Sequence, residues 1–69
     1  MLILSQTKGR IVKNYDYITV HPTDSVRASI GDDDIILGNY KSRERCELIL
    51  EEIIAACANG ENVYVMPWE

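Results

Sequence analysis

The sequence predicts an α+β domain in which an antiparallel sheet of about five strands is covered by one long helix and followed by a short C-terminal strand. Short runs of β-branched and aromatic residues, separated by turn residues, fill positions 1–41 and predict the strands. Residues 43–58 contain no Gly or Pro and repeat apolar residues at helical spacing. Sixty-nine residues are enough for a single domain over 1–69.

The first strands are predicted over residues 2–6 and 11–13, joined in a hairpin by a turn in which Gly9 is available for a positive φ. Residues 14–16 interrupt the pattern with either a bulge or a turn, and the two alternatives stay open. Residues 17–21 then resume as a strand that ends before Pro22, which cannot donate to a ladder.

Residues 26–30 alternate apolar and polar side chains, as is typical of a strand with one covered face. A turn at 31–34 leads into a strand at 35–40, whose run of Ile35, Ile36 and Leu37 indicates that both of its faces are covered. Residues 63–66 form the last strand, which joins either an earlier strand or a second copy of the chain.

The helix is predicted to begin after Ser42, because a serine hydroxyl at the N-cap accepts a hydrogen bond from a free N–H group of the first turn. It should end at Asn59-Gly60, since Gly adopts the left-handed conformation at low cost. At about 100° per residue, the core-facing stripe comprises Cys46, Ile49, Leu50, Ile53 and Cys57, flanked by Ile54 and Ala56. Leu48 is the large apolar side chain of this helix that should point at water.

The charge of the chain is unevenly distributed. Residues 1–30 carry four basic and two acidic residues, which is 4 − 2 = +2, whereas residues 31–69 carry three and nine, which is 3 − 9 = −6. Because a protein that binds phosphate backbones needs a basic footprint, direct nucleic-acid binding is not expected. No apolar run approaches the length of a membrane span, so we expect a cytoplasmic protein without membrane contact.

The two cysteines lie on the same predicted helix. Cys46 and Cys57 are eleven positions apart, so their Cα atoms should be about 16 Å apart at a rise of about 1.5 Å per residue. A disulfide needs less than about 7 Å. We therefore expect two free thiols, both buried on the core stripe.

Few residues offer catalytic or metal-binding chemistry. The three consecutive aspartates at 32–34 lack the alternate spacing of a calcium loop and instead indicate an acidic turn. His21 is the single histidine, and nothing in the sequence places a nucleophile or carboxylate beside it. The sequence thus predicts no enzymatic activity, no metal site and no cofactor.

Two arginines stand at the start of the predicted helix, where the helix dipole disfavours cations. Arg43 and Arg45 could hold an anion or a nucleotide phosphate at the helix N-terminus, where free N–H groups point outward. The alternative is a pair of surface arginines, with Arg43 meeting Glu47 one turn on and Arg45 reaching residues 32–34 or water.

Leu48 and Trp68 are the candidate interface residues. An exposed leucine on a helix, together with an aromatic residue near the chain end, can anchor self-association or the binding of a partner. The residues predicted to surround Leu48 in this interface are Glu44, Glu51, Glu52 and Ala55. Alternatively, Trp68 folds back and caps a small core.

Five stretches spread over nearly the whole chain form a recognisable succession, namely Leu4-Ser5-Gln6, Ile11-Val12 with Asn14 and Asp16, Ile36 to Ser42 with Glu44-Arg45, Leu50 to Ile53, and Tyr64 to Pro67. In these stretches the chain resembles a group of very small uncharacterised proteins of Gram-positive bacteria and their phages and prophages. This resemblance implies a cytoplasmic protein of mobile-element origin and assigns no catalytic or ligand residues. This chain departs from the usual pattern at Cys46, Cys57 and Trp68.

These observations lead to one main hypothesis and two alternatives. The main hypothesis is a small non-enzymatic interaction module, encoded by a phage or prophage, that forms a homodimer and binds a host protein. The second is a small-molecule or nucleotide binder that uses Arg43, Arg45 and the helix N-terminus. The third is an acidic mimic of nucleic acid.

Overall fold

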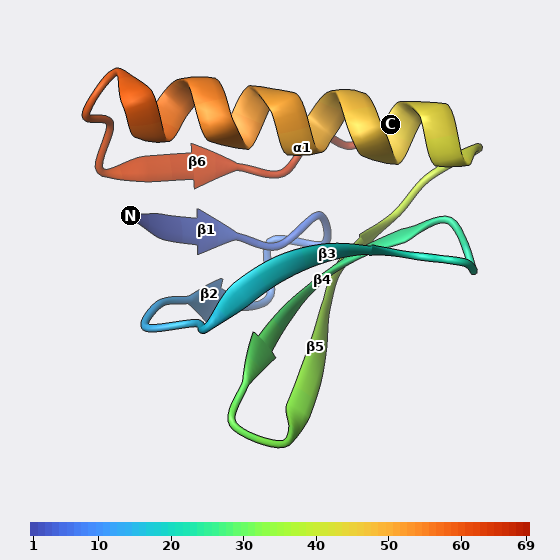
Figure 1. Ribbon diagram of the computed structural model, residues 1–69, viewed down its shortest axis with the longest axis horizontal. Coiled ribbons are helices and arrows are strands. Elements are labelled where there is room, and N and C mark those ends of the chain that lie inside the picture. Colours follow the sequence, from blue (N-terminus) through green and yellow to red (C-terminus); the bar gives the residue numbers. More distant parts are fainter.

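The computed structural model describes residues 1–69 and confirms the α+β class (Figure 1). It contains one helix and six strands, which are β1 (Leu2–Leu4), β2 (Ile11–Val12), β3 (Tyr17–His21), β4 (Ser25–Ile30), β5 (Asp33–Asn39), α1 (Arg43–Ala58) and β6 (Val63–Val65). The helix has the bounds expected from the sequence. This helix is not long and apolar enough to span a membrane.

The strands are divided between two three-stranded sheets. Sheet A has the order β2-β1-β6, with β1 antiparallel to β2 and parallel to β6. Sheet B is the antiparallel meander β3-β4-β5. The last strand therefore pairs within the chain, beside β1. Residues 13–16 carry the chain from sheet A to sheet B, with Asn14 at a φ of 57°, so the interruption is a turn between sheets.

Both ends of the helix follow the capping expected from the sequence. The N–H of Arg45 donates to the Ser42 hydroxyl at 3.2 Å. At the other end, Gly60 has a φ of 73°, and the N–H groups of Gly60 and Glu61 donate to the carbonyls of Cys57 and Ala56. This is the Schellman pattern, which satisfies carbonyls that have no partner inside the helix.

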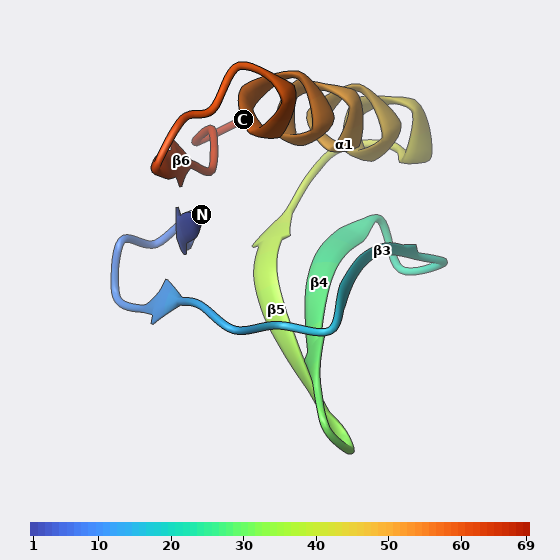
Figure 2. The same cartoon turned by 60° about the vertical axis from the view of Figure 1, so that its left-hand side comes forward.

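The helix lies across the two sheets and buries a stripe that is rotated from the expected one (Figure 2). Its buried residues are Cys46, Ile49, Ile53 and Ala56. Cys57 is exposed, so the expectation that both thiols are buried was wrong for Cys57. At about 100° per residue, Ile49 and Ala56 lie on one side of Cys46, whereas Leu50, Ile54 and Cys57 lie on the other. That second side turns away from the sheets, and Ile54 is 62% exposed.

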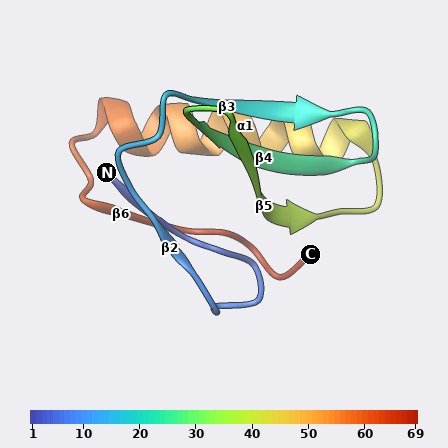
Figure 3. The same cartoon turned by 90° about the horizontal axis from the view of Figure 1, so that it is seen from below.

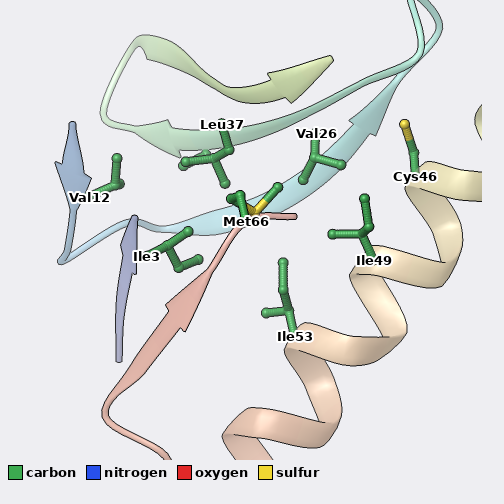
Figure 4. Close-up of a cluster of buried hydrophobic side chains, with 9 residues drawn as sticks. Ile3, Val12, Val26, Leu37, Cys46, Ile49, Ile53 and Met66 are labelled. Atoms are coloured by element: carbon green, nitrogen blue, oxygen red, sulfur yellow. The ribbon is translucent and has the colours of Figure 1, made fainter. Parts of the chain in front are cut away.

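The hydrophobic core lies between the inner faces of the two sheets and the helix (Figure 4). Met66, which follows β6, is fully buried in its centre, and its N–H donates to the carbonyl of Leu4 at 3.0 Å. The other members of this cluster are Ile3, Val12, Val26, Ala28, Leu37, Cys46, Ile49 and Ile53. The residue after the last strand thus closes the core.

Sheet B contains a register shift opposite the step from Val26 to Arg27, where Leu37 is the extra residue on β5. Ile36 then lies on the outer face and is 47% exposed, so the expectation that both faces of this strand are covered was wrong. The seven-residue β5 is seen from below in Figure 3.

Two hairpin turns were expected from the sequence, one between β1 and β2 and one in the acidic segment before β5. In the first hairpin, the residue with positive φ is Lys8, at 61°, and not Gly9. The acidic segment contains a hairpin turn, as expected, but the turn is limited to Gly31 and Asp32, with Gly31 at a φ of 59° and Ile30 paired with Asp33. Asp33 and Asp34, which were expected in the turn, already belong to β5. The Gly31 N–H donates to an Asp16 carboxylate oxygen at 2.9 Å, which ties this turn to the start of β3.

Candidate functional site

The C-terminal tail is held against the domain by side chains that bind three successive carbonyls. The Tyr40 hydroxyl donates to the Pro67 carbonyl at 2.8 Å, and Gln6 Nε2 donates to the Trp68 carbonyl at 2.7 Å. Arg45 donates from Nε and Nη2 to the Glu69 carbonyl at 3.0 and 2.7 Å. We call Gln6, Tyr40 and Arg45 the tail clamp.

Gln6 connects three parts of the molecule. Its backbone N–H donates to the Leu37 carbonyl at 2.7 Å, which joins the end of β1 to β5. Its side-chain amide accepts from the Asn39 N–H and donates to the Asn39 carbonyl, both at 2.9 Å. Because the same amide nitrogen also reaches Trp68, Gln6 fixes the tail relative to both sheets.

Tyr40 enters the clamp from the segment between β5 and α1. Its ring lies over Gly38, where an added Cβ would be 2.6 Å from the Tyr40 hydroxyl oxygen. Burial raises the pKa of Tyr40 to about 12, so the hydroxyl keeps its proton and acts as a donor to Pro67.

Trp68 itself is 69% exposed although its backbone is held. The alternative in which it folds back to cap the core does not hold. Met66 already fills the core at this end of the chain, and the two residues after it are anchored through their carbonyl oxygens. The Trp68 indole is thus exposed, while side-chain hydrogen bonds already hold the backbone around it in place.

The outer face of the helix carries the other predicted interface residues. Leu48 is 52% exposed, as expected, and forms a shallow surface depression with Glu44, Glu47, Leu50 and Glu51. Ala55, two turns after Leu48, is also exposed. This acidic helix face, defined by Glu44, Glu47, Leu48 and Glu51, is therefore a negatively charged surface with an apolar centre.

The tail clamp connects this face to Trp68. Arg45 Nη1 lies 3.8 Å from Glu52 Oε2 while its other guanidinium nitrogens hold the Glu69 carbonyl. Leu48 stands three positions after Arg45 and four before Glu52, so it neighbours both on the helix surface. The end of the tail thus lies at the margin of the acidic helix face.

Glu52 was expected in an interface, but its carboxylate contacts other side chains of the same chain. Its Oε1 accepts a hydrogen bond from the Tyr64 hydroxyl at 2.7 Å, in addition to the approach of Arg45 to Oε2. Burial and this hydrogen bond raise the pKa of Tyr64. Glu52 therefore links β6 to the helix beside the proposed surface.

The two arginines of the nucleotide-binding hypothesis are not assembled around the helix N-terminus. Arg43 Nε lies 3.4 Å from Glu47 Oε2, one turn along the helix, as the surface-pair alternative expects. Arg45 extends toward Glu69 and Glu52 instead of residues 32–34. Both side chains thus point along the helix, away from its free N–H groups.

The remaining reactive side chains lie apart from this surface. His21 Nδ1 is 3.4 Å from the Thr23 hydroxyl in the turn after β3. Cys46 is buried, and burial raises the pKa of its thiol, so the nucleophilic thiolate is disfavoured. No group of three or more His, Cys, Asp or Glu side chains is placed to hold a metal ion.

Arg45 was expected from the sequence to bind an anion, and Trp68 was expected in an interface. Gln6 and Tyr40 were not among the expected site residues. Gln6 meets Trp68 across 62 positions, and no local pattern marks such a pairing. The available signal was Gly38, two positions before Tyr40, because a glycine inside a strand often marks the close approach of another group. Comparisons of the chain with protein-family models, curated proteins and solved structures found no match.

Proposed function

We propose that the protein is a small non-enzymatic interaction module that binds a protein of its host through Trp68 and the acidic helix face. A mobile-element origin is part of the proposal and is motivated by the resemblance of the sequence motifs to small phage and prophage proteins. Self-association is part of the proposal but uses a surface other than Trp68 and the helix. The expected host partner is a protein with a basic patch beside an apolar pocket.

The observation that carries this proposal is the exposure of Trp68 on a clamped backbone. Trp68 is 69% exposed, while the carbonyls on either side of it, and its own, accept side-chain hydrogen bonds. Tryptophan is enriched among the residues that dominate binding energy at interfaces. Ordering the tail before binding lowers the entropic cost of association.

The charge of the neighbouring helix face favours a basic partner. Glu44, Glu47 and Glu51 surround Leu48 on this face. A second copy of the chain bound here by a two-fold axis would bring these glutamates together, and like charges across an interface oppose binding. We therefore assign this face to a partner of opposite charge and not to self-association.

The nucleotide-binding alternative is less well supported. Arg45 would have to release the Glu69 carbonyl, which it holds at 2.7 Å, before it could turn to a phosphate. A thermal-shift panel of nucleotides tests this alternative, because a ligand that binds the folded state raises its melting temperature. Acidic mimicry of nucleic acid differs from our proposal in expecting the partner to be a DNA-binding protein that is displaced from DNA.

The proposal is tested by affinity capture from a lysate of a Gram-positive host, with quantification of each captured protein. We expect Trp68→Ala and Leu48→Glu each to reduce the capture of the same protein at least about tenfold. Tyr17→Ala is the matched control, because Tyr17 is another exposed aromatic residue, 58% exposed on β3. Its capture profile should equal that of the original protein.

Trp68 also provides a direct signal, since it is the single tryptophan of the chain. Binding of the purified partner should shift its fluorescence to shorter wavelength, and added salt should weaken binding because the helix face is acidic. Capture that is equally strong with Trp68→Ala and Leu48→Glu would overturn the assignment of this surface.

A further inference from the structure

The outer face of sheet A is apolar and uncovered. Ile3 and Val12 point into the core, so alternation along each strand places their neighbours on the opposite face. Those neighbours are Leu2, Leu4 and Ile11, and Val63 and Val65 join them because Tyr64 between them pairs with Ile3; we call these five residues the sheet A outer face. Ile11 is 65% exposed, and Val63 and Val65 are each 49% exposed. Figure 2, with sheet A at the left, places the helix and sheet B on its inner side.

The residue pattern of these strands is that of a sheet covered on both sides. Leu2-Ile3-Leu4 and Val63-Tyr64-Val65 are continuous apolar runs, and β1 and β6 pair in parallel. Strands of all-parallel sheets, which are buried on both faces, lack alternating polar residues in the same way. Within one copy of the chain, sheet A is covered on its inner face alone.

Opposite charges flank this face on its two edge strands. Lys13 follows β2 and continues the outward position of Ile11, on the β2 edge of the sheet. Glu61 lies two positions before β6, beyond the same end of the sheet as Lys13 and on the β6 edge. The face is therefore basic at one edge, apolar in the middle and acidic at the other edge.

We propose that two copies of the chain pack the sheet A outer face against itself, about a two-fold axis that runs parallel to the strands. That axis places β2 of one copy over β6 of its partner, so Lys13 is level with the first residue of that β6 and comes close to Glu61 of the partner subunit, once at each edge. The apolar residues then form a layer between two aligned sheets, about 10 Å apart. This inference rests on the self-association in the proposed function and names its surface, which does not involve Trp68 or the helix.

The sheet A outer face would supply the centre of such a dimer and not the whole contact. Its strands have two or three residues each, so it is smaller than a standard interface of about 800 Å² per partner. The five aliphatic side chains would supply its dry centre, and the turns that flank the strands would supply its rim. Association would also cover apolar surface that a 69-residue domain cannot bury alone.

Sedimentation equilibrium over a range of protein concentrations tests this proposal. The original chain should dimerise, and Val65→Lys should weaken dimerisation at least about a hundredfold, because two lysines would enter an apolar interface. Ile11→Lys, on the other edge strand, should do the same. Both positions are exposed in one copy of the chain, so circular dichroism and thermal melting should show folded variants.

The matched control is Ile54→Lys, which adds the same charge at an apolar residue that is 62% exposed on the helix. It should leave the dimer unchanged. A charge exchange tests the orientation of the two copies. Lys13→Glu and Glu61→Lys should each weaken the dimer about tenfold, and the double variant should recover it because the reciprocal pairs form again.

Three outcomes would overturn the proposal. The first is a strict monomer at every concentration. The second is a dimer that survives Val65→Lys and Ile11→Lys or is broken by Ile54→Lys, which would place the contact elsewhere. The third is a double charge variant no stronger than either single one, which would reject the two-fold arrangement. Partner capture by the folded monomeric Val65→Lys variant, compared with Trp68→Ala, separates failure here from failure of the proposed function.

Discussion

The ring of Tyr40 occupies the space that a side chain on Gly38 would need. A Cβ atom at position 38 would lie 2.6 Å from the Tyr40 hydroxyl oxygen, and 2.8 and 2.9 Å from two ring carbons. The same hydroxyl donates to the Pro67 carbonyl. A missing side chain on β5 thus determines where the C-terminal tail is held, 27 positions beyond Tyr40.

Replacing Gly38 with alanine should therefore destabilise the fold and loosen the tail. The added methyl group forces the Tyr40 ring to move, and overpacking of this kind costs about 1–3 kcal/mol in the free energy of unfolding. Urea denaturation measures this loss. The fluorescence anisotropy of Trp68 should fall at the same time, because its backbone is no longer fixed by the Pro67 contact.

Gly9→Ala is the control for this prediction. An added Cβ at position 9 has its nearest neighbour, the Thr7 hydroxyl oxygen, at 3.5 Å, which is ordinary contact. Because the substitution reduces the conformational entropy of the unfolded chain, it should be neutral or stabilise by up to about 1 kcal/mol. If Gly38→Ala behaved in the same way, the space around Gly38 would not control Tyr40.

Gln6→Glu should separate the donor role of Gln6 from its size. A glutamate can still accept from the Asn39 N–H, but it cannot donate to the carbonyls of Asn39 and Trp68. We expect a loss of about 1–2 kcal/mol in unfolding free energy, similar to that of Gln6→Ala, together with faster removal of the last residues by carboxypeptidase. A Gln6→Glu variant as stable as the original chain would show that these donors are dispensable.

Local chemistry explains why much of the fold could be predicted from the sequence. Ser42 and Gly60 define the ends of the helix through hydrogen bonds to residues at most five positions away. The turn at Gly31 follows from the conformational freedom of glycine in the same way. Such interactions involve neighbouring residues, so their signal is present in a short stretch of sequence.

The division into two sheets and the tail clamp could not be predicted in this way. The parallel pairing of β1 with β6 joins the two ends of the chain, and the sequence left the partner of the last strand open. The exposure of Cys57 depends on how the helix is rotated on the sheets, which is a property of packing and not of helical period. The apolar run Val63-Tyr64-Val65 has the pattern of a strand covered on both faces, although one copy of the chain leaves Val63 and Val65 half exposed.

The two cysteines should differ in reactivity. Cys57 is exposed, whereas Cys46 is fully buried and has a pKa raised by burial. An aromatic disulfide reagent should therefore modify one thiol rapidly in the native protein and the second on the timescale of unfolding. Cys57→Ser should abolish the fast phase with little change in stability, whereas Cys46→Ser should cost about 1–3 kcal/mol because it buries a hydroxyl group.

Alkaline pH should destabilise the protein through Tyr40 and Tyr64. Burial raises the pKa of Tyr40 from 10.0 to about 12, and burial with a hydrogen bond to Glu52 raises the pKa of Tyr64. Below pH 10 both rings are protonated in the folded and the unfolded chain, so their contribution to stability is complete. Above pH 10 the unfolded chain releases these protons first, and the free energy of unfolding should fall as the pH rises toward 12.

Urea denaturation at intervals between pH 9 and pH 12 measures this slope (about pH 10 is the usual tyrosine pKa). Tyr40→Phe loses the Pro67 hydrogen bond and should be less stable at neutral pH, but its stability should fall less steeply above pH 10. Tyr64→Phe should flatten the curve in the same direction, and the double variant should flatten it most. Equal slopes in all four proteins would mean that neither hydroxyl is held protonated by the fold, and the donor role of Tyr40 in the tail clamp would be rejected.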